Sequence, residues 1–186
     1  MISSSRHPLV LKPGLMTLEQ LKLIHGHQQF IALPDSCRPD IRKSQALVEA
    51  YANGDAPVYG VNTGFGKLAN QRINKEQLHT LQLNLIRSHS VGVGEPLSAP
   101  IIRLMMATKA ASLARGYSGV REIVIDTLLA VHNAGLVPDV PSQGSVGASG
   151  DLAPLAHMTL ALLGEGYIWV SGNKKPALKA LNDAGI

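Results

Sequence analysis

The chain of 186 residues is short of several residue types on which common kinds of site depend. Cys37 is its only cysteine, so no internal disulfide can form, and aromatic residues make up 4% of the chain. No apolar run approaches the ~20 residues that a membrane-spanning helix needs, and residues 1–6 lack the apolar segment of a secretory signal. We therefore expect a cytoplasmic protein without a membrane partner, whose core consists mainly of aliphatic side chains and methionine.

Concentrated positive charge and metal-binding patterns are missing as well. The formal net charge is +4, and the longest basic run is Lys174-Lys175, whereas a nucleic-acid surface needs basic residues clustered on one face. The histidines form no HExxH motif, and no cluster of cysteine and histidine has the spacing of zinc ligands. The sequence thus predicts neither a nucleic-acid partner nor a metal ion.

What the chain does contain is a globular balance of 45% hydrophobic and 16% charged residues, with apolar positions at helical spacing. Thr17 and Gln20 have the spacing of a capping box, and Gly54 suits the position just past a helix end. We predict one mainly α domain over residues 1–186, in which glycine-rich loops carry the site. Helices are expected to begin near Thr17, Ile41, Asn74, Ser98, Ser118, Asp151 and Pro176, with short extended pieces at 30–33, 58–61 and 167–170 and a loop at 138–150.

The expected helices over residues 98–115 and 119–133 are apolar on more than one face. Helices with this pattern are buried between other elements. Two interpretations stay open here. Either these helices form the core of this domain, or further chain or further subunits cover them.

The glycine-rich segment from Gly144 to Asp151 allows three interpretations. As a phosphate loop it lacks the Gly-Lys-Ser/Thr ending and the G-x-G-x-x-G order, so we predict no nucleotide. As a flexible loop it only leads into the next helix. As a self-cyclising segment it lets the nitrogen of Gly150 attack the carbonyl of Ala148, and loss of the Ser149 hydroxyl leaves an alkene conjugated to the new ring.

The residues around this tripeptide decide between the three. Residues 144–157 read GSVGASGDLAPLAH, which closely resembles the signature of the aromatic amino acid ammonia-lyases. The resemblance implies that Ala148, Ser149 and Gly150 form a 4-methylidene-imidazol-5-one cofactor autocatalytically, with Ser149 as its electrophilic part. It also implies a reaction that uses neither a metal nor a nucleotide.

A second block agrees, because residues 59–66 read YGVNTGFG and resemble the tyrosine loop of the same family. The resemblance implies that Tyr59 is the catalytic base. A phenol is a poor base at its ordinary pKa of about 10, so the site must lower that value or couple proton loss to the electrophile. The resemblance further implies that Asn62 and Gly66 shape the wall of the substrate pocket.

A third block concerns the substrate. Family members differ at a dipeptide that here is Ser88-His89, which resembles the histidine-specific branch, as do residues 91–97 and 112–119. A neutral imidazole carries one donor and one acceptor, so His89 suits an imidazole ligand. The resemblance implies non-oxidative elimination of ammonia from L-histidine to give trans-urocanate, carried out by a homotetramer.

The resemblance runs from about Thr17 to Ile186, whereas family members continue much further. We therefore expect an N-terminal part that is inactive when isolated, without the family's long C-terminal helical bundle and without its arginine for the substrate carboxylate. Two alternatives stay open. One is a truncated, non-catalytic remnant that at most binds intact subunits, and the other is a lyase or aminomutase for another aromatic amino acid.

Overall fold

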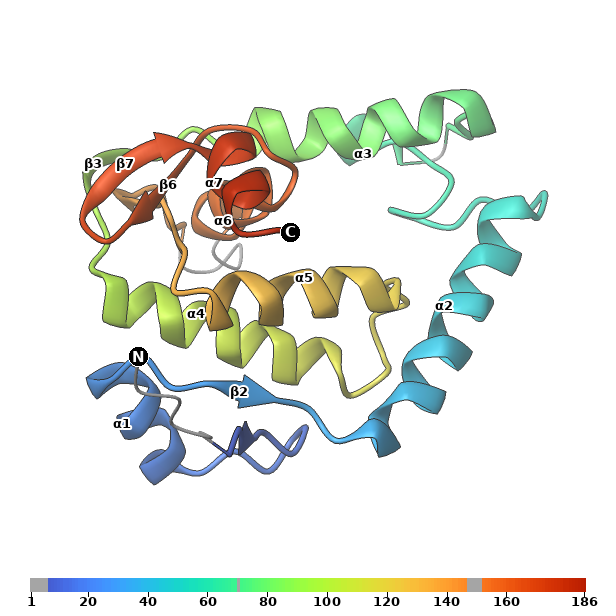
Figure 1. The fold of residues 1–186 in the computed structure, drawn as a ribbon. Helices are drawn as coiled ribbons and strands as arrows, with labels where there is room; N and C mark the ends of the chain where they lie inside the picture. The colour runs from blue at the N-terminus through green and yellow to red at the C-terminus, as the bar shows by residue number, and fades with distance from the viewer. Residues whose placement is uncertain (1–6, 70, 147–151) are drawn as a thin grey trace.

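The computed structural model describes residues 7–69, 71–146 and 152–186. These residues form a mainly helical protein with a few short strands, as the sequence predicts (Figure 1). Within these ranges, none of the helices is long and apolar enough to cross a membrane. The helices are α1 (Leu18–Gly26), η1 (Asp35–Cys37), α2 (Arg38–Asn53), η2 (Gly66–Leu68), α3 (Lys75–His89), α4 (Ala99–Leu113), α5 (Glu122–Asn133), α6 (Leu152–Leu162) and α7 (Ala177–Asp183), where η marks a 3-10 helix.

In the described ranges the strands are short and form three small sheets. They are β1 (Leu9–Val10), β2 (Ile31–Ala32), β3 (Val93–Pro96), β4 (Val137–Pro138), β5 (Pro141–Gln143), β6 (Tyr167–Val170) and β7 (Asn173–Pro176). β1 pairs in parallel with β2, and β3 pairs antiparallel with β5. The third sheet has the antiparallel order β4-β6-β7. Two of these pairings, β3 with β5 and β4 with β6, fix the course of the chain on its way to Gly144.

Local signals in the sequence account for several of these elements. The capping box is present, because the Thr17 Oγ1 accepts from the Gln20 N–H at 3.3 Å and the Gln20 Oε1 accepts from the Thr17 N–H at 3.1 Å. Gly54 caps the end of α2. The hairpin of β6 and β7 turns at Ser171 and Gly172, which both have positive φ. The capping box and the position of Gly54 are thus confirmed predictions from sequence.

The extended piece expected at residues 58–61 is wrong. These residues form a turn in which the N–H groups of Val61 and Asn62 both donate to the carbonyl oxygen of Val58, at 3.0 and 3.2 Å. Gly60 has a φ of 73°, a left-handed value that glycine adopts readily, and this reverses the chain. The segment has the apolar residues of a strand, but no described strand pairs with it.

The loop expected at residues 138–150 contains β5 and the end of β4. Val137 pairs with Trp169, and Pro141 pairs with Pro96, so both strands depend on partners far away in the sequence. The prolines and glycines of this stretch are typical of turns. They say nothing about such partners, and the local signal therefore missed both strands.

The helix expected to start after Ser118 begins later than predicted. α5 starts at Glu122, with Arg121 in the N-cap position. Gly119 has a φ of 65°, and a Cβ at this position would lie 2.2 Å from a methyl group of Val48 in α2. This close approach holds the chain outside a helical conformation before Arg121.

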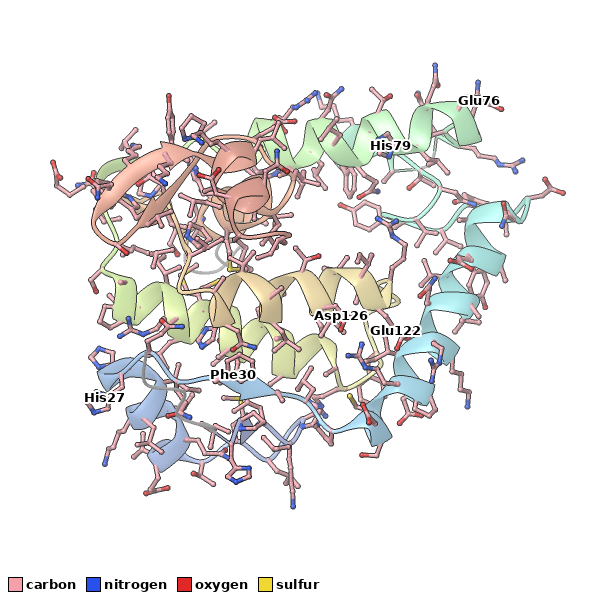
Figure 2. All side chains as sticks on the ribbon, in the orientation of Figure 1. His27, Phe30, Glu76, His79, Glu122 and Asp126 are labelled. Carbon is pink, nitrogen blue, oxygen red and sulfur yellow. The ribbon has the colours of Figure 1, made fainter. Side chains whose placement is uncertain are left out.

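α4 and α5 lie side by side in the middle of the molecule (Figure 1). α1 packs on α4 and β2 on α5, while α6 and α7 follow on the opposite side, and α3 packs along α6. α2 stands across the end of α5. There Arg38 forms ion pairs of 3.5 and 2.6 Å with Glu122 and Asp126, the two acidic residues labelled on α5 in Figure 2.

The core occupies both sides of α4. Met106 and Ala110 are buried in the main cluster with α5, α6 and α7, whereas Ala107 and Ala111 are buried with Ile24 of α1 in a second cluster. The apolar pattern on more than one face of α4 is thus explained by the core of this domain, which was one of the two interpretations left open.

Candidate active site

Tyr59 and His89, which the sequence assigns to catalysis and to substrate recognition, line one hollow of about 520 Å³. The loop before α3 supplies Tyr59, and the end of α3 supplies His89. The first two turns of α6 form the opposite wall, and α4 contributes one charged side chain. The lining residues are Tyr59, Phe65, Leu85, Ile86, His89, Lys109, Leu152, Leu155, Ala156 and Thr159.

The ring of Tyr59 is held by an aromatic neighbour in its own loop. Its centroid lies 5.8 Å from that of Phe65, with the two planes at 79°, an edge-to-face contact. The Tyr59 side chain is nevertheless 64% exposed. Phe65 therefore contacts the ring of Tyr59, while most of the Tyr59 side chain stays exposed beside the hollow.

Asn62 holds the loop in shape from the inside. It is buried, its Oδ1 accepts from the Val58 N–H at 2.7 Å, and its Nδ2 donates to the carbonyl oxygens of Tyr51 and Ala56, both at 3.0 Å. Gly66 is exposed, has a φ of 58° and begins η2. The structure places both residues next to the Tyr59 turn, but not among the residues that line the hollow.

His89 is oriented by the helix that carries it. Its Nδ1 lies 2.7 Å from the carbonyl oxygen of Leu85, and a carbonyl oxygen only accepts, so Nδ1 carries the hydrogen. In the neutral ring this leaves Nε2 as an acceptor. Ser88 is exposed, and its Oγ donates to the same Leu85 oxygen at 3.1 Å and lies 3.2 Å from the His89 Nδ1. Ser88 thus contacts the ring of His89 and does not itself line the hollow.

The tripeptide Ala148, Ser149 and Gly150 lies outside the described residues, but the chain on both sides of it is tightly packed. A Cβ on Gly144 would lie 3.0 Å from the Cβ of Ala153 in α6 and 3.0 Å from the Cα of Gly92. The segment before the tripeptide is therefore fixed against the first turn of α6, which itself borders the hollow.

His157 supports this packing. Its Nε2 accepts a hydrogen bond from the Gly92 N–H at 3.0 Å. Burial lowers the pKa of His157 below the ordinary histidine value, and the neutral ring that results is the form able to accept this bond. His157 therefore acts as a packing and hydrogen-bonding residue at the start of α6.

Lys109 and Thr159 line the hollow but were not predicted from the sequence. Lys109 and Arg103 are the two charged residues within the largely apolar α4, which is a signal that could have singled them out. Arg103 points elsewhere, since it donates to the carbonyl oxygens of Ile24 and His25 at 3.0 and 2.7 Å. Lys109 is the one that reaches the hollow.

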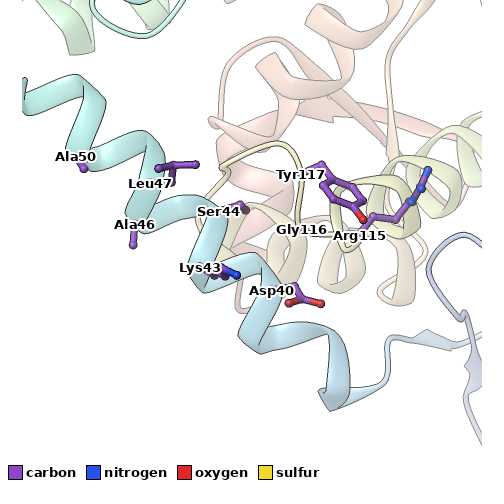
Figure 3. Close-up of a pocket in the computed structure, with 9 residues that line it drawn as sticks. All are labelled: Asp40, Lys43, Ser44, Ala46, Leu47, Ala50, Arg115, Gly116 and Tyr117. Atoms are coloured by element: carbon purple, nitrogen blue, oxygen red, sulfur yellow. The ribbon is translucent and has the colours of Figure 1, made fainter. Parts of the chain in front are cut away.

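Another hollow, of about 620 Å³, lies between α2 and the segment after α4 (Figure 3). Lys43 and Leu47 line it from α2, and Arg115 lies over the ring of Tyr117, 5.4 Å from its centroid, on the other side. Of the described residues that the sequence assigns to catalysis or substrate binding, none lines this second hollow. The hollow beside α6 is therefore the candidate active site.

Two curated relatives of this chain carry the same name. Residues 16–186 match the family described as aromatic amino acid lyase. Over 176 residues the chain is 53% identical to the histidine ammonia-lyase of Aromatoleum aromaticum, an alignment that covers 95% of this chain and 34% of that protein. It is 49% identical over 179 residues to the histidine ammonia-lyase of Burkholderia pseudomallei, covering 96% and 35%. The chain thus spans about a third of the length of these curated relatives.

Solved structures of the same group share the fold. The histidine ammonia-lyase of Trypanosoma cruzi superposes with a TM-score of 0.86 at 37% identity, over 95% of this chain and 34% of that one. The tyrosine aminomutase of Streptomyces globisporus superposes with a TM-score of 0.89 at 33% identity, over 97% and 34%. With a family match across residues 16–186, this chain belongs to the aromatic amino acid lyase family.

Proposed function

We propose that the protein is a histidine ammonia-lyase, which eliminates ammonia from L-histidine to give trans-urocanate. The observation that carries the proposal is that Tyr59 and His89 line one hollow at the start of α6, next in sequence to Ala148, Ser149 and Gly150. Relatives at 53% and 49% identity that are named histidine ammonia-lyase support it.

The residues around the hollow fit a cofactor made from Ala148, Ser149 and Gly150. A methylidene-imidazolone at this point would supply the electrophile that the reaction needs, because neither the β-hydrogen nor the amine of histidine reacts unaided. α6 begins at Leu152 and borders the hollow, so its N-terminal N–H groups favour negative charge at this end. The tight packing of Gly144 on Ala153 fixes the approach of the chain.

Tyr59 would take the proton from the β-carbon of the substrate. General bases of this kind contribute about 10²–10⁴-fold to a rate when they are held within reach of the proton. The edge-to-face contact with Phe65 supplies that positioning, and the hydrogen bonds of Asn62 fix the turn from which Tyr59 projects. Asn62 and Gly66 would therefore shape the pocket by shaping the loop.

His89 would recognise the imidazole ring of the substrate. Its Nδ1–H is engaged by the Leu85 oxygen, so the Nε2 lone pair is directed to a donor such as the N–H of a neutral imidazole. Leu85, Ile86 and Leu155 offer apolar surface for the faces of that ring. Ser88 would act by holding His89 in this orientation.

The test is the deamination of amino acids by the assembled enzyme isolated from its native source, and not by residues 1–186 alone, for which we expect no activity. We expect formation of urocanate from L-histidine, and no comparable product from L-tyrosine or L-phenylalanine. His89→Phe should lose most of the activity on histidine, whereas Ser88→Ala, which keeps the imidazole and its bond to the Leu85 oxygen but removes one contact to the ring, should lose less. Absence of urocanate when the wild-type protein is given L-histidine would contradict the proposal.

A second candidate is a lyase or aminomutase for another aromatic amino acid. It is favoured by the similarity to the tyrosine aminomutase structure, which has a TM-score of 0.89 at 33% identity. Tighter binding of L-tyrosine or L-phenylalanine than of L-histidine would favour this second candidate. A β-amino acid product would identify an aminomutase, and a free alkene product with ammonia would identify a lyase.

The assembly and location also belong to this proposal. A homotetramer is expected from the family resemblance, and a cytoplasmic location from the sequence. Light scattering on the purified protein measures the first. If this chain were a non-catalytic remnant, it would co-purify with intact subunits and form no urocanate alone.

A further inference from the structure

The hollow contains a lysine to which neither catalysis nor imidazole recognition assigns a role. Lys109 projects from α4 and lines the hollow together with Tyr59 and His89. It also borders a neighbouring hollow of about 520 Å³, which shares Leu155 with the first. Lys109 therefore stands at the edge where the two spaces meet.

Lys109 is half-buried and has no ion pair or hydrogen bond with any residue in the described part of the chain. Arg103, on the same helix, satisfies its guanidinium with two carbonyl oxygens. A cation that is partly removed from water without an anionic partner is unfavourable. An ammonium placed in this way is suited to an anion that arrives with a ligand.

The proposed substrate brings such an anion. Among the described residues that line the hollow, Tyr59 and His89 account for the β-hydrogen and the imidazole, and Lys109 is the remaining ionisable side chain. We propose that Lys109 binds the carboxylate of the amino acid substrate and so positions its β-carbon at Tyr59. This inference rests on the proposed function. The family resemblance already implies an arginine for the carboxylate, and Lys109 would be a second cation at the same group.

The experiment compares Lys109→Met, which keeps the length of the side chain without its charge, with Lys109→Arg, which keeps the charge. Lys43→Met, in the separate hollow at α2, is the matched control. Calorimetry measures the binding of L-histidine and of histamine, the same molecule without the carboxylate. Steady-state kinetics measure KM and kcat for L-histidine.

We expect Lys109→Met to weaken histidine binding and raise KM roughly tenfold, with kcat changed less than KM, since a charged hydrogen bond is lost. Histamine binding should be unchanged, and Lys109→Arg and Lys43→Met should resemble the wild type. Unchanged histidine binding in Lys109→Met overturns the inference while the proposed function stands. Equal loss of histidine and histamine binding also overturns it, because the residue would then be structural. A wild-type protein that binds no histidine overturns both.

Discussion

The backbone N–H of Gly92 donates a hydrogen bond to Nε2 of His157, at a distance of 3.0 Å. This bond joins the chain between α3 and β3 to the second turn of α6. A Cβ on Gly92 would lie 3.1 Å from the carbonyl oxygen of Gln143, so the same contact also depends on the absence of a side chain there. The start of α6 is thereby fixed relative to β3 and β5.

Replacing His157 should destabilise the protein. In His157→Leu the Gly92 N–H loses its acceptor, and we expect a fall of about 1–3 kcal/mol in the free energy of unfolding, measured by urea denaturation. His157→Gln, which offers an amide oxygen, should recover part of the loss. His79→Leu, on the exposed face of α3 (Figure 2), is the control. Equal stability of the leucine and glutamine variants would show that the hydrogen bond contributes nothing.

The stability of the protein should fall as the pH drops below about 6.5, the ordinary histidine pKa. His132 is fully buried, and burial lowers its pKa, as does the positive charge of Arg103. The unfolded chain therefore binds protons at a higher pH than the folded chain does. The stability that His132 contributes is fully present above the pKa of histidine in the unfolded chain. It is lost progressively as the pH falls toward the lower pKa of His132 in the folded chain.

Unfolding of His132→Phe between pH 7 and pH 5 tests this assignment. The variant removes the titrating ring, whose Nε2 contacts the carbonyl oxygen of Gln29 at 3.0 Å, so it should be less stable at pH 7. Its stability should also depend less on pH than that of the wild type. His27→Phe, at an exposed position (Figure 2), should keep the wild-type slope. A slope in His132→Phe equal to that of the wild type would assign the effect to other groups.

Asn62 should matter more for stability than an ordinary polar residue. Its buried side chain makes three hydrogen bonds to backbone groups, so Asn62→Ala should lower the free energy of unfolding by about 2–3 kcal/mol. Asn53→Ala, which loses one exposed hydrogen bond to the Glu49 oxygen, is the matched control. A loss in Asn62→Ala no larger than in the control would mean that the loop does not depend on this amide.

Tyr59→Phe should separate activity from stability. The phenyl ring keeps the edge-to-face contact with Phe65 and loses the hydroxyl, so we expect unfolding within about 0.5 kcal/mol of the wild type. Turnover of L-histidine should fall by about 10²–10⁴-fold if Tyr59 is the base. Phe65→Leu, which removes the ring that orients Tyr59, should give a smaller loss of turnover. Near-normal turnover in Tyr59→Phe would exclude Tyr59 as the base.

The sequence predicted the helices better than the strands, for a physical reason. The capping box at Thr17 and the apolar spacing of α4 are local properties, readable along the chain. The pairing of Val137 with Trp169 depends on residues far away in the sequence, and no local pattern reveals it. The turn at Gly60 was missed because its apolar neighbours resemble those of a strand.

The sequence predicts which residues belong to the candidate site, but not that they lie around one hollow. Tyr59 and His89 could be chosen from their motifs, yet their common hollow depends on the packing of α3 along α6. The same holds for Lys109, whose place beside them follows from the position of α4. The motif also suggested that Asn62 forms the wall of the pocket, whereas its side chain is engaged within the loop.

The mass of the peptide that contains Ala148, Ser149 and Gly150 tests the central claim most directly. The peptide would be prepared by proteolysis of the protein isolated from its native source, with Ser149→Ala as the control. Our account predicts a mass lower than that of the encoded sequence by two molecules of water, and the encoded mass in the variant. A wild-type peptide with its full encoded mass would contradict the account, because the electrophile that it assigns to this protein would not be formed.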